Sequence, residues 1–453
     1  IYTLSLHDAL PIWRTIALIL SVLMMLGSYA VIATAEAKNY SDVTIRLANH
    51  DIEGSTGIEV PIEIAHFKAV AERMGFNLVI EGVAGDELRN KIKVDAAANN
   101  LPDVFKFWNG GVMADYVQAG LIQPIDDYLA LSQVVKEENY PESAWLGTKF
   151  DGVRYGIPYQ QGIGCFLANK EIFDKCGVAI PENGWTLDEF LAACKVFRDN
   201  GVTPTNVGSL GGNPSHFFYG DFVCQYADGN ELTATLSQTL LFDNPTFRKA
   251  AEAMVVMRDA KVFPDDTVAG GDWTPSAVLY EEGKTAMCYT FGWTFSNFTQ
   301  ATVDKSVCIP LPKLPDSERD PMHFIQGTVN DNYMINKASW ADEKKRDCIV
   351  ALLDEFFGPI ELEAAKIYAR VPVDKSTLAQ VDYSKDPTMM GKVMAYRQKV
   401  GVEGSPMIWM SCPDTKTQFD YQAYLDELWS GAIDADTFMK KTQASFDEYK
   451  DNM

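Results

Sequence analysis

The chain has 453 residues, of which 47% are hydrophobic and 22% charged, so it can bury a large core and is not of the disordered class. Its formal net charge of -23 argues against a nucleic-acid partner, because such proteins use Lys and Arg to displace counterions from phosphates. The length exceeds what one core usually supports, so we expect two lobes.

Residues 1–37 are predicted to be an artefactual extension followed by a signal peptide, and we exclude them from the fold. Residues 1–12 lack an initiator Met, whereas Arg14 precedes an apolar run at 16–32 that ends in small residues suited to cleavage. A membrane anchor is the alternative interpretation, because the run approaches spanning length. The first cysteine is Cys165, far from the cleavage region, so we expect a periplasmic protein without a lipid anchor.

Strands and helices alternate from the start of the predicted mature chain. Strands are predicted at 42–48, 76–81 and 101–108, with helices that end at Gly75, cover 86–98 and end near Gly120. This alternation is typical of a parallel sheet with helices on both faces. At the other end of the chain, two helices are predicted at 417–429 and 434–449, and we expect the second to pack on a lobe.

Polar and aromatic residues follow the first and third predicted strands. Ligands of parallel sheets bind beyond the carboxyl ends of the strands, where loops and helix N-termini converge. Asn49 and Asp51 follow the first strand, and Trp108 and Asn109 close the third. We predict that these four residues contact a ligand. Core packing is the alternative for Trp108, and a turn or a helix cap is the alternative for Asn49 and Asp51.

Several motifs, in a fixed order, resemble those of bacterial extracellular solute-binding proteins, the sugar-type receptors of ABC importers that include maltose-binding-protein-like receptors. Residues 147–175 carry a Gly-containing turn, a strand that stops at Pro158, a crossover, a second strand and a helix start. Further matching segments are 101–104 (LPDV), 120–128 (GLIQPIDDY), 185–190 (WTLDEF), 282–287 (EGKTAM), 291–293 (FGW), 332–339 (NYMINKAS) and 369–375 (ARVPVDK). No single motif is specific, but their common order spans most of the chain.

The resemblance implies an α/β fold of the periplasmic-binding-protein-like type II, with two lobes, a hinge and a ligand cleft between them. It places residues 42–158 and 327–383 in an N-terminal lobe, and residues 159–326 and 384–453 in a C-terminal lobe. It also implies a monomeric receptor without cofactor or catalytic activity, whose partners are a carbohydrate and the permease subunits of an ABC transporter in the membrane.

The resemblance further implies ligand contacts in the second lobe and at the hinge. Trp293 lies in a Gly-aromatic loop that faces the cleft in the family. By resemblance His216 is also a candidate, because the family often places ligand residues at that point after a strand. Gln160 and Gln161 are candidates on the crossover, and Gln326 and Arg370 are candidates in the third segment. Asp272, Trp273 and Trp409 are candidates because they sit beside Gly, Pro or Asp in loop-like contexts. Core packing is the alternative for Trp293, and a capped helix start is the alternative for His216. Aromatic faces suit the C–H groups of a sugar, and polar side chains pair with its hydroxyls. We therefore expect the ligand to be a carbohydrate, and specifically an oligosaccharide.

Other function classes find less support in the residues. A glycoside hydrolase needs two carboxylates that flank the scissile bond, and no local motif marks such a pair. A receptor for another solute, such as a peptide, a polyamine or a metal complex, stays open as an alternative. The eight cysteines are irregularly spaced, which favours buried thiols over disulfides, and none of the five histidines stands at zinc-ligand spacing from a cysteine.

Overall fold

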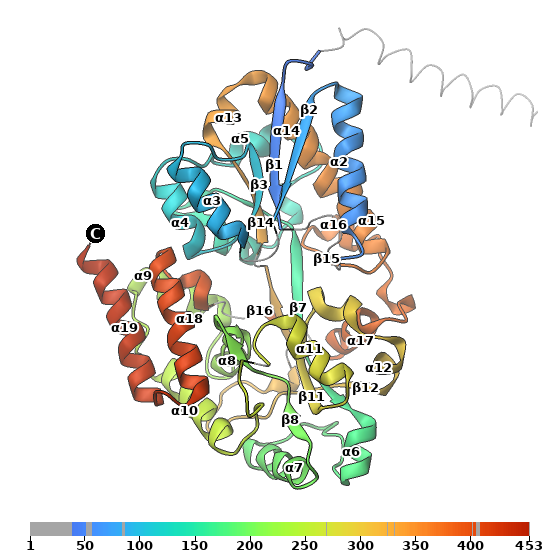
Figure 1. The fold of residues 1–453 in the computed structure, drawn as a ribbon, viewed down its shortest axis with the longest axis vertical. Coiled ribbons are helices and arrows are strands. Elements are labelled where there is room, and N and C mark those ends of the chain that lie inside the picture. The colour runs from blue at the N-terminus through green and yellow to red at the C-terminus, as the bar shows by residue number, and fades with distance from the viewer. Residues whose placement is uncertain are drawn as a thin grey trace, which may run out of the picture.

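The structure, a computed structural model, describes residues 39–50, 57–83, 87–268, 270–323, 325–329, 331–400, 402–404 and 408–452. Figure 1 shows two lobes, one above the other, joined by chain segments at the centre. Each lobe combines a sheet with surrounding helices, so the predicted α/β class with two lobes is confirmed. The predicted signal segment and Asp51 lie outside the described residues.

The sheet of the first lobe has the strand order β2-β1-β3-β14-β6. β1 (Thr44–Asn49) pairs in parallel with β2 (Asn77–Gly82) and β3 (Val104–Trp108). β14 (Asp331–Ile335) runs antiparallel to both β3 and β6 (Ile157–Pro158). A strand from a distant part of the chain therefore fills the gap between β3 and β6.

Helices pack on both faces of this sheet. They are α2 (Val60–Met74), α3 (Glu87–Ala97), α4 (Gly111–Gln118), α5 (Asp126–Leu131), α13 (Lys337–Ala341), α14 (Glu343–Glu355), α15 (Glu361–Lys366) and α16 (Lys375–Leu378). One apolar cluster joins Phe67 of α2 to Tyr333 of β14, and a separate one joins Leu88 of α3 to Phe105 of β3. As predicted, α2 ends at Gly75, whose φ of 80° favours glycine.

The sheet of the second lobe is organised around one long strand, β7 (Gln160–Asn169). It pairs antiparallel with β11 (Thr285–Phe291), β12 (Ser306–Ile309) and β13 (Ile325–Thr328). At the edges, β8 (Thr203–Thr205) lies parallel to β11, and β16 (Val402–Gly404) lies parallel to β13. Two short hairpins stand apart from both sheets: β4 (Lys149–Phe150) with β5 (Val153–Arg154), and β9 (Ser209–Leu210) with β10 (Asn213–Pro214).

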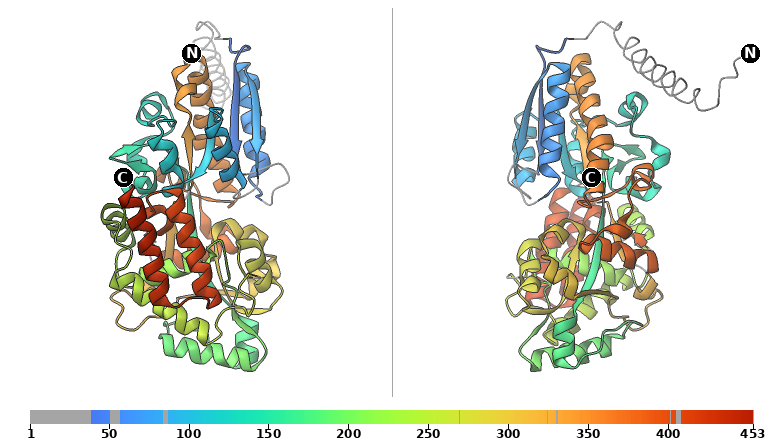
Figure 2. Two further views of the ribbon diagram at one scale, coloured as in Figure 1. Left: turned by 60° about the vertical axis from the view of Figure 1, so that its left-hand side comes forward. Right: turned by 90° about the vertical axis from the view of Figure 1, so that its right-hand side faces the viewer.

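The second lobe also contains the two helices predicted near the end of the chain. Its helices are α6 (Lys170–Cys176), α7 (Leu187–Asp199), α8 (Ser215–Val223), α9 (Gly229–Thr239), α10 (Pro245–Asp259), α11 (Trp273–Glu281), α12 (Gln300–Lys305), α17 (Met389–Val400), α18 (Thr415–Ser430) and α19 (Ala435–Asp451). α18 and α19 lie side by side along the second lobe, drawn in red in the left view of Figure 2. Phe438 and Phe446 of α19 are fully buried against Phe242, so this helix packs on the second lobe, as predicted.

Three chain segments connect the lobes. The first passes from β6 to β7 at Tyr159, and the second passes from β13 to β14 between Thr328 and Asp331. The third runs from α15 through β15 (Val371–Pro372) and α16 to α17. β15 pairs with the first two residues of β7, so the first and third segments lie side by side. The predicted crossover at 160–164 is itself the first half of β7, because β15 and β13 supply its backbone partners.

Candidate functional site

The carboxyl ends of β1 and β3 lie at the same edge of the first-lobe sheet, and β1 runs toward the second lobe (Figure 1). Trp108, the last residue of β3, is half-buried at this edge. The His50 ring stacks on Trp108 with 5.2 Å between centroids, and the guanidinium carbon of Arg89 on α3 lies 4.4 Å from the Trp108 centroid. Trp108 also packs against the apolar core of the second lobe. The two lobes therefore meet at Trp108.

The two asparagines predicted beside Trp108 are interior residues. Asn49 is 2% exposed, and Asn109 is fully buried. The Asn109 side-chain amide donates to the Val329 carbonyl at 2.8 Å, and its oxygen accepts from the Asn332 amide at 2.7 Å. Asn109 thus links the end of β3 to the second crossing segment and to β14. With its side chain engaged in this way, we do not include Asn109 in the proposed site.

Four aromatic rings form a cluster in the second lobe, which we call the aromatic cluster: Phe217, Trp273, Phe291 and Trp293. Trp293 stacks on Phe291 with 4.6 Å between centroids and an interplanar angle of 17°, and it meets Trp273 edge-on at 5.1 Å. Both phenylalanines are buried, whereas both tryptophans are half-buried and present part of their rings at the surface. The exposed Asp272 accepts from the Trp273 backbone N–H at 2.7 Å and so caps α11.

His216 lies in the first turn of α8 and is 5% exposed. Its Nδ1 is 2.6 Å from the Gly212 carbonyl oxygen, which only accepts, so Nδ1 carries the ring proton. Burial lowers the pKa of His216 to about 3, so the imidazole is neutral and Nε2 is an acceptor. The positive charge of Arg89 adds to the lowering of this pKa. Arg89 of the first lobe is thus electrostatically coupled to His216 of the second.

The lobes are in contact where α4 begins. A Cβ atom on Gly111 would lie 2.5 Å from the carbonyl oxygen of Cys412 and 2.9 Å from that of Asp414, so only glycine allows this approach. Beside this contact is a cavity of about 400 Å³ between α3, α4 and the first turns of α18. Small-molecule sites measure roughly 300–1,000 Å³, so this cavity is large enough for a ligand group.

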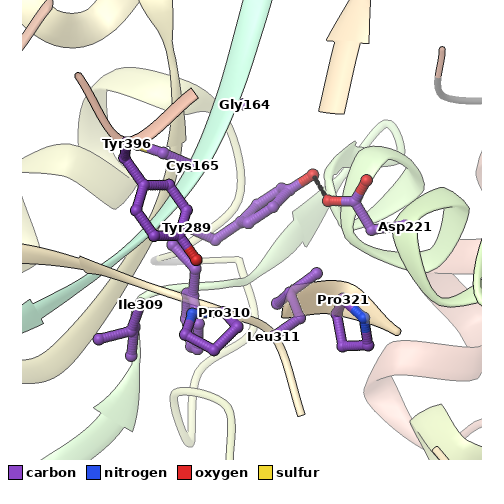
Figure 3. A pocket seen from close by; sticks show the side chains of 10 residues that line it. Gly164, Cys165, Asp221, Tyr289, Ile309, Pro310, Leu311, Pro321 and Tyr396 are labelled. Atoms are coloured by element: carbon purple, nitrogen blue, oxygen red, sulfur yellow. Dashed lines mark hydrogen bonds between the residues drawn. The ribbon is translucent and has the colours of Figure 1, made fainter. Parts of the chain in front are cut away.

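A smaller pocket lies inside the second lobe, between β7, β11, α8 and α17 (Figure 3). Its volume of about 30 Å³ admits a water molecule and not a sugar. The Tyr289 hydroxyl donates to one carboxyl oxygen of Asp221 at 2.7 Å, while burial raises the pKa of Asp221 to about 8. Among the described residues, the second carboxyl oxygen of Asp221 and the Tyr396 hydroxyl have no hydrogen-bond partner. This pocket is therefore a small gap in the interior of the second lobe, and we do not include it in the proposed sugar site.

The hinge glutamines are half-buried and contact other crossing segments. The Gln160 amide donates to Asp331 at 3.1 Å, and the Tyr159 hydroxyl donates to the same carboxylate oxygen at 3.3 Å. Gln161 pairs with Val371 of β15. Asp331 begins β14, so its carboxylate holds the first crossing segment against the second.

Arg370, a predicted ligand contact, is 3% exposed and lies among acidic residues. Its guanidinium forms ion pairs with Glu63, with Glu59 at 3.5 Å and with Glu361 at 3.5 Å. Burial acts against its charge, but these carboxylates hold the pKa of Arg370 well above its usual value. Burial also raises the pKa of Glu361 to about 7. Because Arg370 is an interior ion-pair partner next to the hinge, we leave it out of the proposed site.

Two further candidates lie in the second lobe, and their own side chains are not described. Gln326 is in β13, and Trp409 is in the 3-10 turn Ile408–Ser411. Ile408 of that turn packs in the same apolar cluster as Phe217. Ligand contact by Gln326 and Trp409 stays a prediction, as it does for Asp51.

Arg89 and Asp331 contact the predicted residues Trp108 and Gln160, and the sequence did not predict either of them as a candidate. Arg89 lies in the first turn of α3, the helix that follows β2, and therefore near the carboxyl edge of a parallel sheet. That position was available as a signal. Asp331 has no such signal, because its partner Gln160 is 171 positions away.

Three properties of the described ranges concern metal binding, membrane spanning and the cysteine thiols. Those ranges hold no group of three or more His, Cys, Asp or Glu arranged to bind a metal ion. Of the helices they contain, none has the length and apolar character needed to cross a membrane. All eight cysteines fall within them and are free thiols.

Two α/β lobes, an antiparallel strand β14 within the first sheet and three crossing segments define a fold of the type II periplasmic-binding-protein-like class. A family model described as bacterial extracellular solute-binding protein matches residues 63–359, and the chain belongs to this family. It is a family of solute-binding receptors that serve ABC transporters, and not an enzyme family.

Relatives and solved structures agree with this assignment. The chain is similar to an uncharacterized ABC transporter extracellular-binding protein from Pyrococcus horikoshii, at 24% identity over 51% of this chain and 52% of that protein. The alignment thus spans about half the length of that curated relative. A structure from work on xylan utilization by the thermophilic bacterium Caldanaerobius polysaccharolyticus matches with a TM-score of 0.71 at 22% identity, covering 89% of this chain and 99% of that one. A chitin oligosaccharide binding protein matches with a TM-score of 0.72 at 17% identity, covering 89% and 98%.

Proposed function

We propose that the chain captures a carbohydrate between its lobes outside the cytoplasm and delivers it to the permease of an ABC importer. The carbohydrate we propose is an oligosaccharide. The observation that carries this proposal is the presence of half-buried tryptophans in both lobes. Trp108 stands at the carboxyl edge of the first-lobe sheet, and Trp273 and Trp293 stand in the aromatic cluster of the second. The oligosaccharide-binding structures with the same fold support the ligand class.

The chemistry of these side chains suits a sugar ring. A pyranose has C–H faces that pack on aromatic rings and a rim of hydroxyls that must keep hydrogen bonds when buried. Trp293 is held in a fixed orientation by its stack on Phe291, so little side-chain entropy is lost on binding. His216 supplies an acceptor and Arg89 supplies donors beside these rings. The site thus combines flat apolar surface with both kinds of polar partner.

Capture would use hinge closure. The first and second crossing segments meet where Tyr159 and Gln160 donate to Asp331, and the third meets the first where β15 pairs with Gln160. The lobes also touch at Gly111. A ligand that contacts both lobes favours the closed arrangement by the free energy of the contacts it makes only there. The closed form would then be the one that the permease recognises.

The test measures binding and closure together. The purified protein is titrated with neutral and acidic oligosaccharides by calorimetry, and small-angle scattering compares the radius of gyration with and without the tightest binder. We expect micromolar or tighter binding of at least one oligosaccharide and a smaller radius of gyration in the complex. A protein that binds none of a broad glycan panel, or binds a peptide or polyamine instead, would refute the proposal.

A matched pair of tryptophan variants locates the site. Trp293→Phe removes part of the exposed aromatic surface, whereas Trp340→Phe makes the same change at a buried position on α13 in the first lobe. We expect W293F to raise the Kd by about tenfold, which corresponds to about 1.4 kcal/mol, and W340F to leave it within about twofold. Equal effects of the two changes would argue against Trp293 as a contact.

A further inference from the structure

The cavity of about 400 Å³ between α3, α4 and α18 lies next to Trp108 and has walls from both lobes. Phe107 lines it and meets Trp108 edge-on at 5.6 Å. Arg89 also lines it, and its guanidinium carbon is 4.4 Å from the Trp108 centroid. A saccharide packed against Trp108 can therefore extend into this cavity.

Three aromatic side chains line the cavity, and they come from both lobes. Phe107 and Tyr116 of the first lobe meet edge-on, with 5.6 Å between their centroids and an interplanar angle of 87°. Phe419, on α18 of the second lobe, is 47% exposed, so much of its ring is available to a ligand. Rings of this kind pack on the C–H faces of sugars.

The charges around the cavity balance one another. Its charged lining residues are Arg89, Lys93, Asp115, Asp414 and Lys416. Lys416 is paired with Asp420 at 2.8 Å and with Glu448 at 3.0 Å, so its charge is balanced outside the cavity. The remaining lining residues are two basic and two acidic ones, which favours a neutral ligand over an anion or a cation.

Polar groups on the cavity wall suit the hydroxyls of a neutral sugar. Asn90 and Thr415 line the cavity, and their side chains can both donate and accept hydrogen bonds. Burial raises the pKa of Tyr116 to about 12, so its hydroxyl stays protonated at neutral pH and can donate. A sugar hydroxyl that loses water on entering the cavity therefore meets donors and acceptors that replace it.

The cavity also lies beside the contact between the lobes. Asp414 lines it, and the carbonyl oxygen of Asp414 would be 2.9 Å from a Cβ atom on Gly111. The α3 and α4 side of the cavity belongs to the first lobe, and the α18 side belongs to the second. A sugar unit in this cavity would touch both lobes, so its contacts would favour the closed arrangement.

We propose that this cavity is a subsite for a neutral sugar unit, which extends the saccharide bound at Trp108 and packs on Phe419. The receptor then binds a longer neutral oligosaccharide more tightly than a shorter one. This proposal rests on the proposed function, because it assumes that the lobes enclose a saccharide. It names the charge of that saccharide, its extension beyond Trp108 and the residue that distinguishes longer chains from shorter ones.

The test measures how affinity depends on chain length. Neutral oligosaccharides of glucose, xylose and N-acetylglucosamine, from the disaccharide to the hexasaccharide, are titrated by calorimetry into wild-type protein, Phe419→Ala and Leu241→Ala. L241A is the control, because it truncates a 52% exposed apolar side chain of the same lobe that does not line the cavity.

We expect a ratio of Kd values that reports the subsite. In a series that wild type binds, one step in chain length should lower the Kd by about tenfold. L241A should keep this ratio between the shorter and the longer sugar. F419A should bring the ratio close to one, while it binds the shorter sugar within about twofold of wild type.

The outcomes separate the two proposals. The subsite would be refuted, and carbohydrate capture left in place, by a wild-type Kd that does not fall with chain length or by an F419A ratio equal to that of wild type. Loss of the shorter sugar by F419A as strongly as the longer one, in a variant whose melting temperature matches wild type, would refute it equally. Failure of the wild-type protein to bind any saccharide would overturn the proposed function and this inference with it.

Discussion

Replacing Asp221 with Asn should stabilise the protein at neutral pH. The pKa of Asp221 rises from 3.8 to about 8 because the carboxyl is buried, so the folded protein keeps it protonated at pH 7 while the unfolded chain ionises it. Between pH 3.8 and about pH 8 the folded state binds more protons at Asp221 than the unfolded state does. The free energy of unfolding of the wild-type protein therefore falls as the pH rises through this range. At about 1.4 kcal/mol per pH unit, over roughly three units, the linkage reaches on the order of 4 kcal/mol at pH 7.

The asparagine variant removes this linkage and keeps the local hydrogen bond. Its side-chain oxygen can still accept from the Tyr289 hydroxyl, and its amide faces the pocket of Figure 3 in place of the carboxyl O–H. The assay compares melting temperatures of D221N and wild type from pH 4 to pH 8, with the exposed Asp199→Asn on α7 as control. We expect no gain for D221N at pH 4 and a gain that grows up to pH 8. A gain that is the same at both ends, or a loss at pH 8, would refute the reasoning.

Three further substitutions test packing and the contact between the lobes. Gly111→Ala would place a Cβ 2.5 Å from the Cys412 carbonyl, so we expect scattering to show a more open protein and calorimetry to show roughly tenfold weaker ligand binding. Arg370→Met leaves Glu63 buried without its partner and should cost about 3–5 kcal/mol in urea unfolding, a loss that adding Glu63→Gln partly restores. Phe438→Ala opens a cavity under α19 and should cost about 3–5 kcal/mol by the same measurement, whereas a cost below about 1 kcal/mol would contradict the packing described.

Elements of the first lobe could be predicted because their signals act over a few residues. Gly75 ends α2 in the left-handed conformation. β1 precedes α2 in the chain and β2 follows it, and both strands match predicted alternating or apolar runs. In the second lobe, Thr186 and Glu189 form the predicted helix entry as a reciprocal capping box. Such signals need no knowledge of the distant chain, and the order of motifs then indicated how the lobes are arranged.

The partners of individual polar residues could not be predicted in this way. Asn109 looks like a loop residue in the sequence, yet its amide oxygen accepts from Asn332, 223 positions away. Arg370 lies in the segment 369–375 that resembles a family motif, and it pairs with Glu63, 307 positions away. A polar residue beside glycine or proline has the same local pattern whether it faces solvent or an interior partner. Only the fold decides between these outcomes, and it placed both residues in the interior.

The position of β14 links the folding of the two lobes. β14 lies between β3 and β6 in the first-lobe sheet, and Asn332 of β14 donates to the Phe107 carbonyl across a separation of 225 positions. Contacts of such long sequence separation form slowly, because the intervening chain must first be brought together. During synthesis, β6 has no neighbour in its sheet until the chain has passed Ile335, and by then most strands of the other lobe have been made. We therefore expect the first lobe to complete its folding late, although its chain is synthesised first. A truncated chain that ends before Asp331 would lack β14, so its hinge and its first-lobe sheet would both be incomplete.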